Sequence, residues 1–378
     1  MLLLSISIAY TFFTLFLIIK WIQLKTVDAL AASIPHLRIT VVIAIRNEEK
    51  NIIELLEDLN RQTFSSAQTE VIIVDDHSTD NTLSIIQFFQ QRAIFTLHVL
   101  ELKNYIPVPL SAGNYKKKAI EIAVHQATGE LIATTDGDCR VGKYWLNSIA
   151  QYYQTHQARF ISGPVTFHAE QTLFEHLQTV EFASLIGSGA VLLATGMPVM
   201  CNGANLAYSK EAFMAAGGYQ DTAGSPSGDD IFLLQKINRL YPGKAFFLKS
   251  PEAIVHTRAK SSWQEFLQQR KRWASKWNLY QDKTASLIAI FIFISNFSLL
   301  IGLVLVMCQL YPLRMFLIQI AIRFGIEFVF LTLVLKFLNK QKNIPFILPL
   351  QLVYFLYVSL VGLITHRKGY EWKGRKLK

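Results

Sequence analysis

The sequence predicts an α/β protein with a mostly parallel sheet, flanked by apolar segments long enough to cross a membrane. Strand-like and helix-like segments alternate from residue 38 to about residue 160. An uncharged run covers residues 2–19, and further long apolar segments follow Tyr280. Alternation of this kind implies right-handed crossovers and a parallel sheet covered by helices on both faces.

Residues 1–24 are predicted to be a membrane anchor that is not cleaved. The run at residues 2–19 carries no charge, and Lys20 and Lys25 follow it. At a rise of about 1.5 Å per residue, such a helix can cross roughly 30 Å of hydrocarbon. A signal peptide would carry positive charge before its apolar run and a small-residue cleavage site after it.

Residues 36–280 are predicted to form the α/β domain. Its helices are expected at residues 48–61, 80–91 (opened by Asp80 as a cap) and 116–127 (ended by Gly129), and its strands at residues 38–45, 71–74, 97–100 and 131–134. Ligands of such sheets bind beyond the carboxyl ends of the strands. Acidic residues follow the first, second and fourth strands directly, so they fall where a ligand would bind.

Residues 182–200 are apolar but contain Gly187, Gly189, Gly196 and Pro198. These residues make a poor spanning helix, and we expect an interfacial or partly buried element of the α/β domain instead.

Residues 286–366 are predicted to hold the C-terminal membrane segments, at residues 286–310, 313–338 and 345–365, before a basic tail at residues 367–378. The middle segment carries Arg323 and Glu327, one helical turn apart, so the two can pair. Their role is either a structural pair between packed helices or contact with a bound headgroup, and we favour the structural pair.

A net charge of +10 is typical of nucleic-acid-binding proteins, so this class is considered first. However, the cations gather near the ends of apolar segments, as positive-inside anchoring produces: Lys336, Lys340, Lys342, Arg367, Lys368, Lys373, Arg375, Lys376 and Lys378. No aromatic-interleaved basic face is present, so we expect no nucleic-acid partner.

The scattered Cys139, Cys201 and Cys308 form no disulfide framework, in keeping with a reducing cytosol.

Two polar clusters follow the first two strands. Residues 46–49 read Arg-Asn-Glu-Glu, and residues 74–80 read Val-Asp-Asp-His-Ser-Thr-Asp. Carboxylates at a strand end can accept hydrogen bonds from a uracil N–H and a ribose hydroxyl, and a capped helix start favours a nearby phosphate. Taken alone, each cluster fits a solvated turn with a helix cap equally well.

The third cluster is Thr-Asp-Gly-Asp at residues 135–138, directly after the fourth strand. Asp136 and Asp138 can hold Mg²⁺ or Mn²⁺ against a diphosphate, because such ions take one or two carboxylates plus phosphate oxygens. The ion would offset charge on a departing nucleoside diphosphate. An isolated pair of this spacing is common by chance, and its place at a strand end favours function.

Two further clusters lie later in the chain. Asp229 and Asp230 precede an apolar run suited to a helix, so one can cap that helix while the other acts as a general base. The sequence Gln-Arg-Lys-Arg-Trp at residues 269–273 lies just before the membrane segments. An ordinary basic juxtamembrane stretch would explain its cations but not the spacing of its Gln and Trp.

In this order the clusters resemble the family 2 glycosyltransferases of the GT-A fold, especially the membrane-integrated branch with a D, DxD, D, QxxRW signature. The resemblance covers residues 38–273, and the flanking apolar segments match as well. It implies that Asn47, Glu48 and Asp76 contact the uridine, with Asp75 beside them in the donor site, and that Lys116 lies near the nucleotide. It further implies that Asp136 touches the ribose or donor sugar, and that Asp138, with Asp136, binds Mg²⁺ or Mn²⁺. It also implies that residues 203–205 line the donor and acceptor pocket and that Asp230 is the base, with Asp229 beside it. The remaining implied site residues, which would close over the diphosphate and the acceptor, are Gln269, Arg272 and Trp273.

The sequence departs from the family pattern in places. Ala44 replaces a frequent Pro, which matters little, and Asp229 replaces the usual Glu before the base, which leaves open which carboxylate acts. His256 is either a third metal ligand or a structural histidine, and we favour the second.

The tail at residues 372–375 resembles a Trp-x-Gly-Arg ending of transferases that act on lipids such as ceramide or carotenoid acids. The same residues also fit an interfacial Trp with a basic flank.

The resemblance implies an enzyme that moves a sugar from a UDP-sugar to an acceptor by one in-line displacement, with inversion. Membrane segments beside the site favour a lipid or lipid-linked acceptor, and the chain is expected in the plasma membrane of a bacterium with its catalytic domain in the cytosol. A processive polysaccharide synthase needs more helices to enclose a channel than the four segments here. A catalytically inactive nucleotide-sugar-binding scaffold would be expected to have lost Asp138, Asp230 or Arg272. The sequence names neither the sugar, the acceptor nor the oligomeric state.

Counting crossings produces a conflict. A cytosolic catalytic domain puts Met1 outside, and three further crossings would put the basic tail outside as well, against the positive-inside tendency. We therefore predict that one C-terminal segment does not span. The last is our choice, because Pro345 and Pro349 weaken helix formation at its start.

Overall fold

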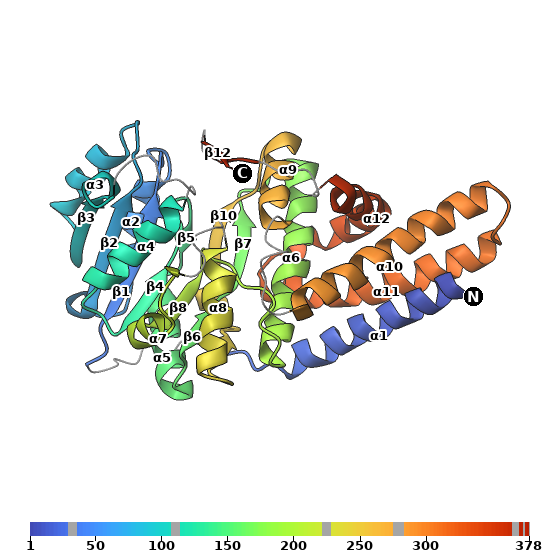
Figure 1. Cartoon of the computed structure of the whole chain (residues 1–378), viewed down its shortest axis with the longest axis horizontal. Helices are drawn as coiled ribbons and strands as arrows, with labels where there is room; N and C mark the ends of the chain where they lie inside the picture. The colour runs from blue at the N-terminus through green and yellow to red at the C-terminus, as the bar shows by residue number, and fades with distance from the viewer. Residues whose placement is uncertain are drawn as a thin grey trace.

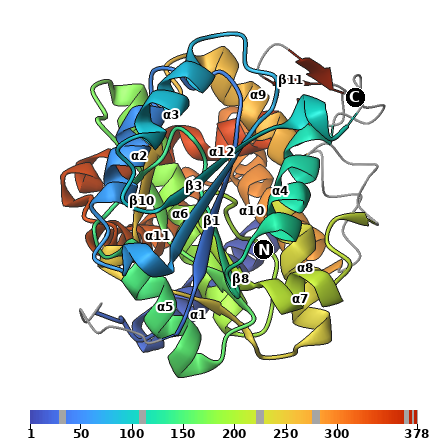
Figure 2. The same cartoon turned by 90° about the vertical axis from the view of Figure 1, so that its left-hand side faces the viewer.

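The structure, a computed structural model, describes residues 1–28, 36–106, 114–220, 228–274, 283–364, 370–372 and 375–377. It consists of an α/β domain and a set of long apolar helices stacked beside it along the longest axis (Figure 1). Turned by 90°, the α/β domain lies toward the viewer and the apolar helices lie behind it (Figure 2). The predicted fold class is confirmed at this level.

The main sheet has seven strands in the order β3-β2-β1-β4-β8-β6-β9. In this order, β3, β2, β1 and β4 are parallel to one another. Strand β8 is antiparallel to both β4 and β6, and β9 is parallel to β6. The strands are β1 (Ile39–Ile45), β2 (Thr69–Asp75), β3 (Thr96–Glu101), β4 (Leu131–Thr134), β6 (Phe160–Ser162), β8 (Leu206–Ser209) and β9 (Ala245–Phe247). The carboxyl ends of β1, β2 and β4 therefore lie side by side.

Both faces of this sheet are covered, so the middle residues of its central strands are apolar on both sides. Val41 and Ile43 of β1 are fully buried, as are Val71 and Ile73 of β2. The helices of the domain are α2 (Ile52–Asn60), α3 (Thr82–Gln90), α4 (Tyr115–Gln126), α5 (Trp145–His156), α7 (Lys210–Ala215), α8 (Asp229–Leu240) and α9 (Trp263–Ala274).

The predicted strands match those observed to within two residues, but the helix starts needed correction. α2 begins at Ile52 and not at Glu48, because the intervening residues form a loop in which Asn47 has a φ of +52°. α3 begins at Thr82; its N-cap position is Asn81, while the Asp80 carboxylate accepts the Thr82 N–H at 3.1 Å. Gly129 does not end α4; a Cβ there would lie 2.7 Å from the Thr40 nitrogen, so it allows close packing on β1.

A second sheet pairs β5 (Arg140–Val141), β10 (Val255–Arg258) and β7 (Val165–His168), in that order. A short antiparallel pair, β11 (Tyr370–Trp372) with β12 (Arg375–Leu377), lies near α9 at the end of the chain (Figure 1).

Helix α6 (Leu173–Ala194) agrees with the expectation of a partly buried element, but it begins earlier and ends earlier than the predicted residues 182–200. It is one continuous helix that starts with a capping box between Thr172 and Glu175. The most apolar 18-residue stretch of the helix is 72% buried inside the protein. The helix stands between the α/β domain and the long apolar helices (Figure 1), as a shared wall of both.

Five described helices are long and apolar enough to cross a membrane, by length and composition. They are α1 (Leu2–Gln23), α6, α10 (Lys283–Met307), α11 (Leu313–Phe337) and a segment at Gln341–Gly362 that joins a 3₁₀ turn (Gln341–Phe346) to α12 (Ile347–Ile364). α1, α10 and α11 run alongside one another, whereas α12 is seen nearly end-on in Figure 1. α12 therefore crosses the direction of the other three.

Buried polar contacts tie the long helices to one another and to the α/β domain. The Lys249 ammonium donates to the Trp21 and Leu24 carbonyls at the end of α1, at 2.8 and 2.9 Å. Within α11, the Arg323 Nη2 and Glu327 Oε1 atoms lie 3.6 Å apart, as the sequence predicted. Lys340, after α11, pairs with the buried Glu170 at 2.8 Å.

Candidate active site

The loops after β1 and β2 lock together at the carboxyl edge of the sheet. The Asn47 side-chain oxygen accepts the Thr79 N–H at 2.9 Å, and the Arg46 guanidinium donates to the Asp76 and His77 carbonyls. Glu48 is buried, and its carboxylate accepts from the Asn51 amide at 2.8 Å. The two loops form one rigid wall.

Asp75 and Asp76 lie in this wall, at the end of β2, and both are buried. One Asp75 oxygen accepts the Ser78 N–H at 3.0 Å. Its other oxygen is buried without a partner among the described residues. The Asp76 carboxylate lies 2.9 Å from the His77 ring nitrogen. A buried acceptor without a donor is suited to an incoming N–H group.

The loop after β4 passes directly against this wall. A Cβ on Gly137 would lie 2.9 Å from an Ile45 methyl carbon and 3.1 Å from the Glu48 Cγ. Only glycine allows so close an approach, which explains the residue between Asp136 and Asp138. The first and third sequence clusters therefore meet in space.

Lys116, in the first turn of α4, links this loop to α8. Its ammonium lies 2.7 Å from an Asp136 oxygen and 3.7 Å from an Asp229 oxygen. Burial disfavours the charge on Lys116, but the two carboxylates outweigh that effect and raise its pKa. The Arg272 charge acts in the opposite direction on the same group, so α9 also contributes to this electrostatic cluster.

Asp229 and Asp230 open α8, and neither is its N-cap, contrary to the sequence-based expectation. The N-cap is Gly228, whose φ of +86° favours glycine, and no side-chain cap bond forms. An Asp230 oxygen accepts the Ile231 N–H at 2.8 Å. Both carboxylates remain near Gly203, where a Cβ would lie 3.6 Å from an Asp229 oxygen and 3.7 Å from the Asp230 Cβ.

Residues 203–205 are divided between the site and the core. Gly203 lies at the site, and its carbonyl accepts from the Thr134 hydroxyl at 3.2 Å. Asn205 is buried: its oxygen accepts from the Trp145 indole, and its amide donates to the Pro164 and Ala253 carbonyls. The expectation that Asn205 lines the pocket is wrong, because its polar atoms hold core segments together.

Helix α9 carries the cluster at residues 269–273. The Gln269 oxygen accepts from Arg270 at 2.7 Å, and the Trp273 ring stacks on Phe182 of α6 with centroids 6.1 Å apart. The Arg270 guanidinium lies 4.3 Å from the Trp273 ring centroid and forms a buried ion pair with Glu181. The sequence did not predict this pair, because Arg270 resembled the other basic residues that precede the membrane segments.

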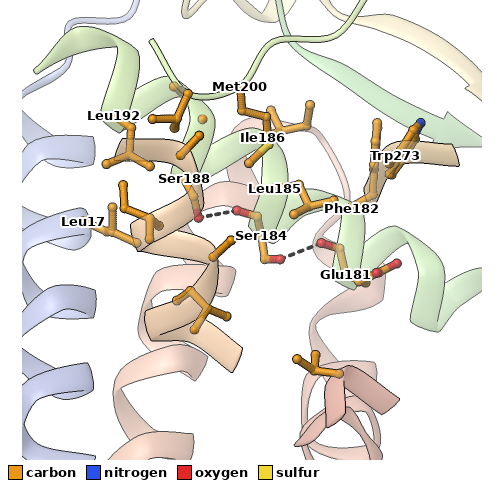
Figure 3. A pocket seen from close by; sticks show the side chains of 18 of the residues that line it. Leu17, Glu181, Phe182, Ser184, Leu185, Ile186, Ser188, Leu192, Met200 and Trp273 are labelled. Carbon is orange, nitrogen blue, oxygen red and sulfur yellow. Dashed lines mark hydrogen bonds between the residues drawn. The ribbon is translucent and has the colours of Figure 1, made fainter. Parts of the chain in front are cut away.

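A cavity of about 770 Å³ opens between α6, α9 and the long helices. Asp230 and Trp273 line it at the α/β domain, and side chains of α1, α10, α11 and α12 line the rest. Figure 3 shows its apolar wall along α6, with Leu185, Ile186 and Leu192, and the hydroxyls of Ser184 and Ser188 bonded to the backbone. The cavity thus connects the acidic cluster with the apolar helices.

Within the described residues, no three His, Cys, Asp or Glu side chains form a group that could hold a metal ion unaided. His256 therefore joins no such group; burial lowers its pKa to about 4. The Asp136 carboxylate lies close to the Lys116 ammonium, and Asp138 follows two residues later in the same loop. Two carboxylates fit a magnesium-type ion that takes its remaining oxygens from a diphosphate.

The sheet is mostly parallel, carboxylates follow the ends of β1, β2 and β4, and a further acidic pair opens α8. Together these features define a GT-A-like glycosyltransferase that uses a nucleotide-sugar. The family models agree with this class. The chain belongs to the family described as Glycosyl transferase family group 2, whose model matches residues 131–358. The model of Glycosyl transferase family 2 matches residues 40–215.

Curated relatives match parts of the chain. It is 26% identical over 247 residues to the probable glycosyltransferase YdaM of Bacillus subtilis, covering 63% of this chain and 54% of that protein. It is 31% identical over 122 residues to the poly(ribitol-phosphate) β-N-acetylglucosaminyltransferase TarS of Staphylococcus aureus, covering 32% of this chain and 20% of TarS. It is 27% identical over 123 residues to the β-monoglucosyldiacylglycerol synthase of Synechocystis, covering 32% of this chain and 24% of that protein. The chain thus spans about half the length, or less, of these relatives.

Among solved structures, the mannosyltransferase PcManGT of Pyrobaculum calidifontis, solved with GDP-mannose and Mn²⁺, has a TM-score of 0.56 and 16% identity. The match covers 93% of this chain and 99% of that chain. At this identity the likeness concerns the fold, which extends over the α/β domain and the long helices. The roles of individual site residues remain predictions.

Proposed function

We propose that this chain is an inverting glycosyltransferase that moves a sugar from a UDP-sugar to a hydroxyl of a membrane lipid. The observation that carries this proposal is the cavity, because it places Asp230 at one end and the side chains of apolar helices at the other. A lipid can keep its tail among these helices while its hydroxyl reaches Asp230.

The wall formed by the β1 and β2 loops is the proposed uridine site. The unpartnered Asp75 oxygen is suited to accept the N–H of the uracil ring, and Asp76, Asn47 and Glu48 complete the wall. Uracil presents one such N–H, whereas guanine presents an N–H and an amino group. This geometry supports UDP as the carrier.

The diphosphate is proposed to lie between the Asp136–Asp138 loop and α9. Asp138, with Asp136 beside it, would hold Mg²⁺ or Mn²⁺; when bound, the ion offsets the negative charge that develops on the departing UDP. The Lys116 ammonium donates to Asp136 at 2.7 Å, and Asp136 is proposed to contact the ribose or the donor sugar. The Arg272 guanidinium can pair bidentately with phosphate oxygens, and Gln269 and Trp273 position α9.

The reaction is a single displacement at the anomeric carbon. Asp230 takes the proton of the acceptor hydroxyl as that oxygen forms the new bond, and the bond between the anomeric carbon and UDP breaks on the opposite face. UDP leaves with the bonding electron pair, and the sugar configuration inverts.

The experiment is to incubate purified enzyme with a panel of radiolabelled UDP-sugars, a divalent metal and total bacterial lipid extract. We expect one sugar to give a labelled glycolipid that partitions into organic solvent. Label found in a long water-soluble polymer would support a polysaccharide synthase. Binding of UDP-sugar without hydrolysis or transfer in any arm would support an inactive scaffold.

A further inference from the structure

We infer that the acceptor is an uncharged lipid alcohol, such as a diacylglycerol, and not a lipid phosphate or an amino lipid. This inference rests on the proposed function and concerns the chemistry of the group that enters the cavity. It is carried by the charges of the cavity wall and by their partners.

Each charged group in the deeper wall of the cavity already has an opposite partner within the protein. Glu181 pairs with Arg270, and Tyr357 also donates to Glu181 at 3.1 Å. Glu327 pairs with Arg323, and the Gln351 amide donates to it at 3.1 Å. Among the described residues, Arg270 is the one cation that lines the cavity.

The same wall offers neutral polar groups among its apolar side chains. Ser184 and Ser188 of α6 and Tyr354 of α12 line it, and the Ser184 and Ser188 hydroxyls donate to backbone carbonyls one turn earlier. Each hydroxyl oxygen retains the capacity to accept a hydrogen bond. A lipid hydroxyl or ester can use such groups without bringing a charge.

In the part of the cavity wall that the structure describes, a lipid phosphate would be desolvated without a cation that is not already engaged. On the donor side of the site, Lys116 is bound to Asp136 and Asp229, and Arg272 is proposed to hold the donor diphosphate. A lipid phosphate would compete with the donor for these groups. A lipid ammonium would instead meet the Asp230 carboxylate, which lines the cavity, and an ion pair there would keep Asp230 from acting as the base. Burial of an unpaired charge is costly enough to reduce binding by roughly 100-fold or more.

The test compares three acceptors of equal chain length in mixed micelles: diacylglycerol, phosphatidic acid and sphingosine. We expect kcat/KM for diacylglycerol to exceed that for the other two by about 100-fold or more. Preferred transfer to the phosphate or the amine would overturn the inference and leave lipid glycosylation standing. Transfer to no lipid, with UDP-sugar hydrolysis intact, would instead refute the proposed function.

Binding provides a second readout that does not need transfer. A diacylglycerol with a photoreactive acyl chain should crosslink to peptides of α6 and α10, with competition by unlabelled diacylglycerol but not by phosphatidic acid. Equal competition by phosphatidic acid would overturn the inference.

A cavity-filling variant completes the test. Ala289→Trp, on the cavity face of α10, should abolish the crosslink and lower transfer to lipid at least tenfold, with UDP-sugar hydrolysis within twofold of wild type. The matched control is Leu287→Trp, because Leu287 is 65% exposed and does not line the cavity. An equal loss in both variants would show that the cavity is not the acceptor site.

Discussion

At the scale of single residues, Lys116 shows how the site is assembled from distant parts of the sequence. Its ammonium contacts Asp136 after β4 and Asp229 at the start of α8. Asp229 is therefore engaged by a cation at the donor side, whereas Asp230 lines the acceptor cavity. This difference favours Asp230 as the base and Asp229 as the residue that orients Lys116.

Asp230→Asn should lower kcat by about 10²–10⁴-fold, because the acceptor hydroxyl loses its base. UDP binding, measured by isothermal titration calorimetry, should change less than twofold. Asp229→Asn is the matched control, and it should weaken donor binding as well as turnover. If Asp229→Asn removes turnover alone while Asp230→Asn is active, the two roles are exchanged.

Asp138→Asn should abolish the stimulation of UDP-sugar turnover by Mg²⁺ or Mn²⁺, because it removes a proposed ligand. Binding of Mn²⁺ in the presence of UDP, followed by electron paramagnetic resonance, should be lost in parallel. Glu130→Gln is a suitable control, since Glu130 is an exposed carboxylate before the opposite end of β4. Wild-type metal dependence in Asp138→Asn would disprove the metal assignment.

The sequence revealed the acidic residues of the site because each follows a strand or opens a helix in an order that resembles a known signature. It did not reveal the pairing of Glu181 with Arg270. These residues are far apart in the chain, and each looked unremarkable in its own segment. Only the packing of α9 against α6 brings them together.

At the scale of elements, α6 links the catalytic and apolar parts of the molecule. One of the glycines that argued against a membrane-spanning helix has a packing role. A Cβ on Gly187 would lie 2.6 Å from a Val334 methyl carbon, so glycine lets α11 pack closely on α6. The strands were predictable because buried strands are continuously apolar, whereas a helix–helix contact between distant segments leaves no such local pattern.

The Glu181–Arg270 pair should be a strong structural link between α6 and α9. Both side chains are buried, at 7% and 6% exposure. Glu181→Gln would leave the guanidinium buried without its counter-charge, which typically costs about 3–5 kcal/mol. A large fall in the thermal unfolding midpoint of the purified protein is expected.

Glu211→Gln serves as the control for this pair. Glu211 also pairs with an arginine, Arg159, but is 67% exposed, and exposed pairs contribute only about 0–1 kcal/mol. Equal changes in unfolding midpoint for Glu181→Gln and Glu211→Gln would show that the buried pair has no special role.

At the scale of the whole molecule, the arrangement of the long helices bears on membrane topology. α10 and α11 have 25 residues each, or about 37 Å at 1.5 Å per residue, enough to cross a bilayer. α1, α10 and α11 run alongside one another, while α12 crosses them next to the α/β domain (Figure 1). This supports our proposal that the last apolar segment lies at the interface and that the chain crosses three times.

In that topology, the turn between α10 and α11 lies on the opposite side of the membrane from the catalytic domain and the tail. Cys308, which is exposed at this turn, should react with an impermeant thiol reagent on intact cells. A cysteine added after Lys378, in a variant with Cys139, Cys201 and Cys308 replaced by Ala, should react only after lysis. Labelling of the added cysteine on intact cells would disprove the three-crossing topology.

The anomeric configuration of the product tests the central claim most directly, since it reports on both the transfer and its geometry. The measurement is the one-bond carbon–hydrogen coupling at the anomeric centre of the purified glycolipid, by nuclear magnetic resonance. A single displacement with Asp230 as base predicts a β-linked glycolipid from an α-linked UDP-sugar. An α-linked product from that donor would contradict the proposed mechanism.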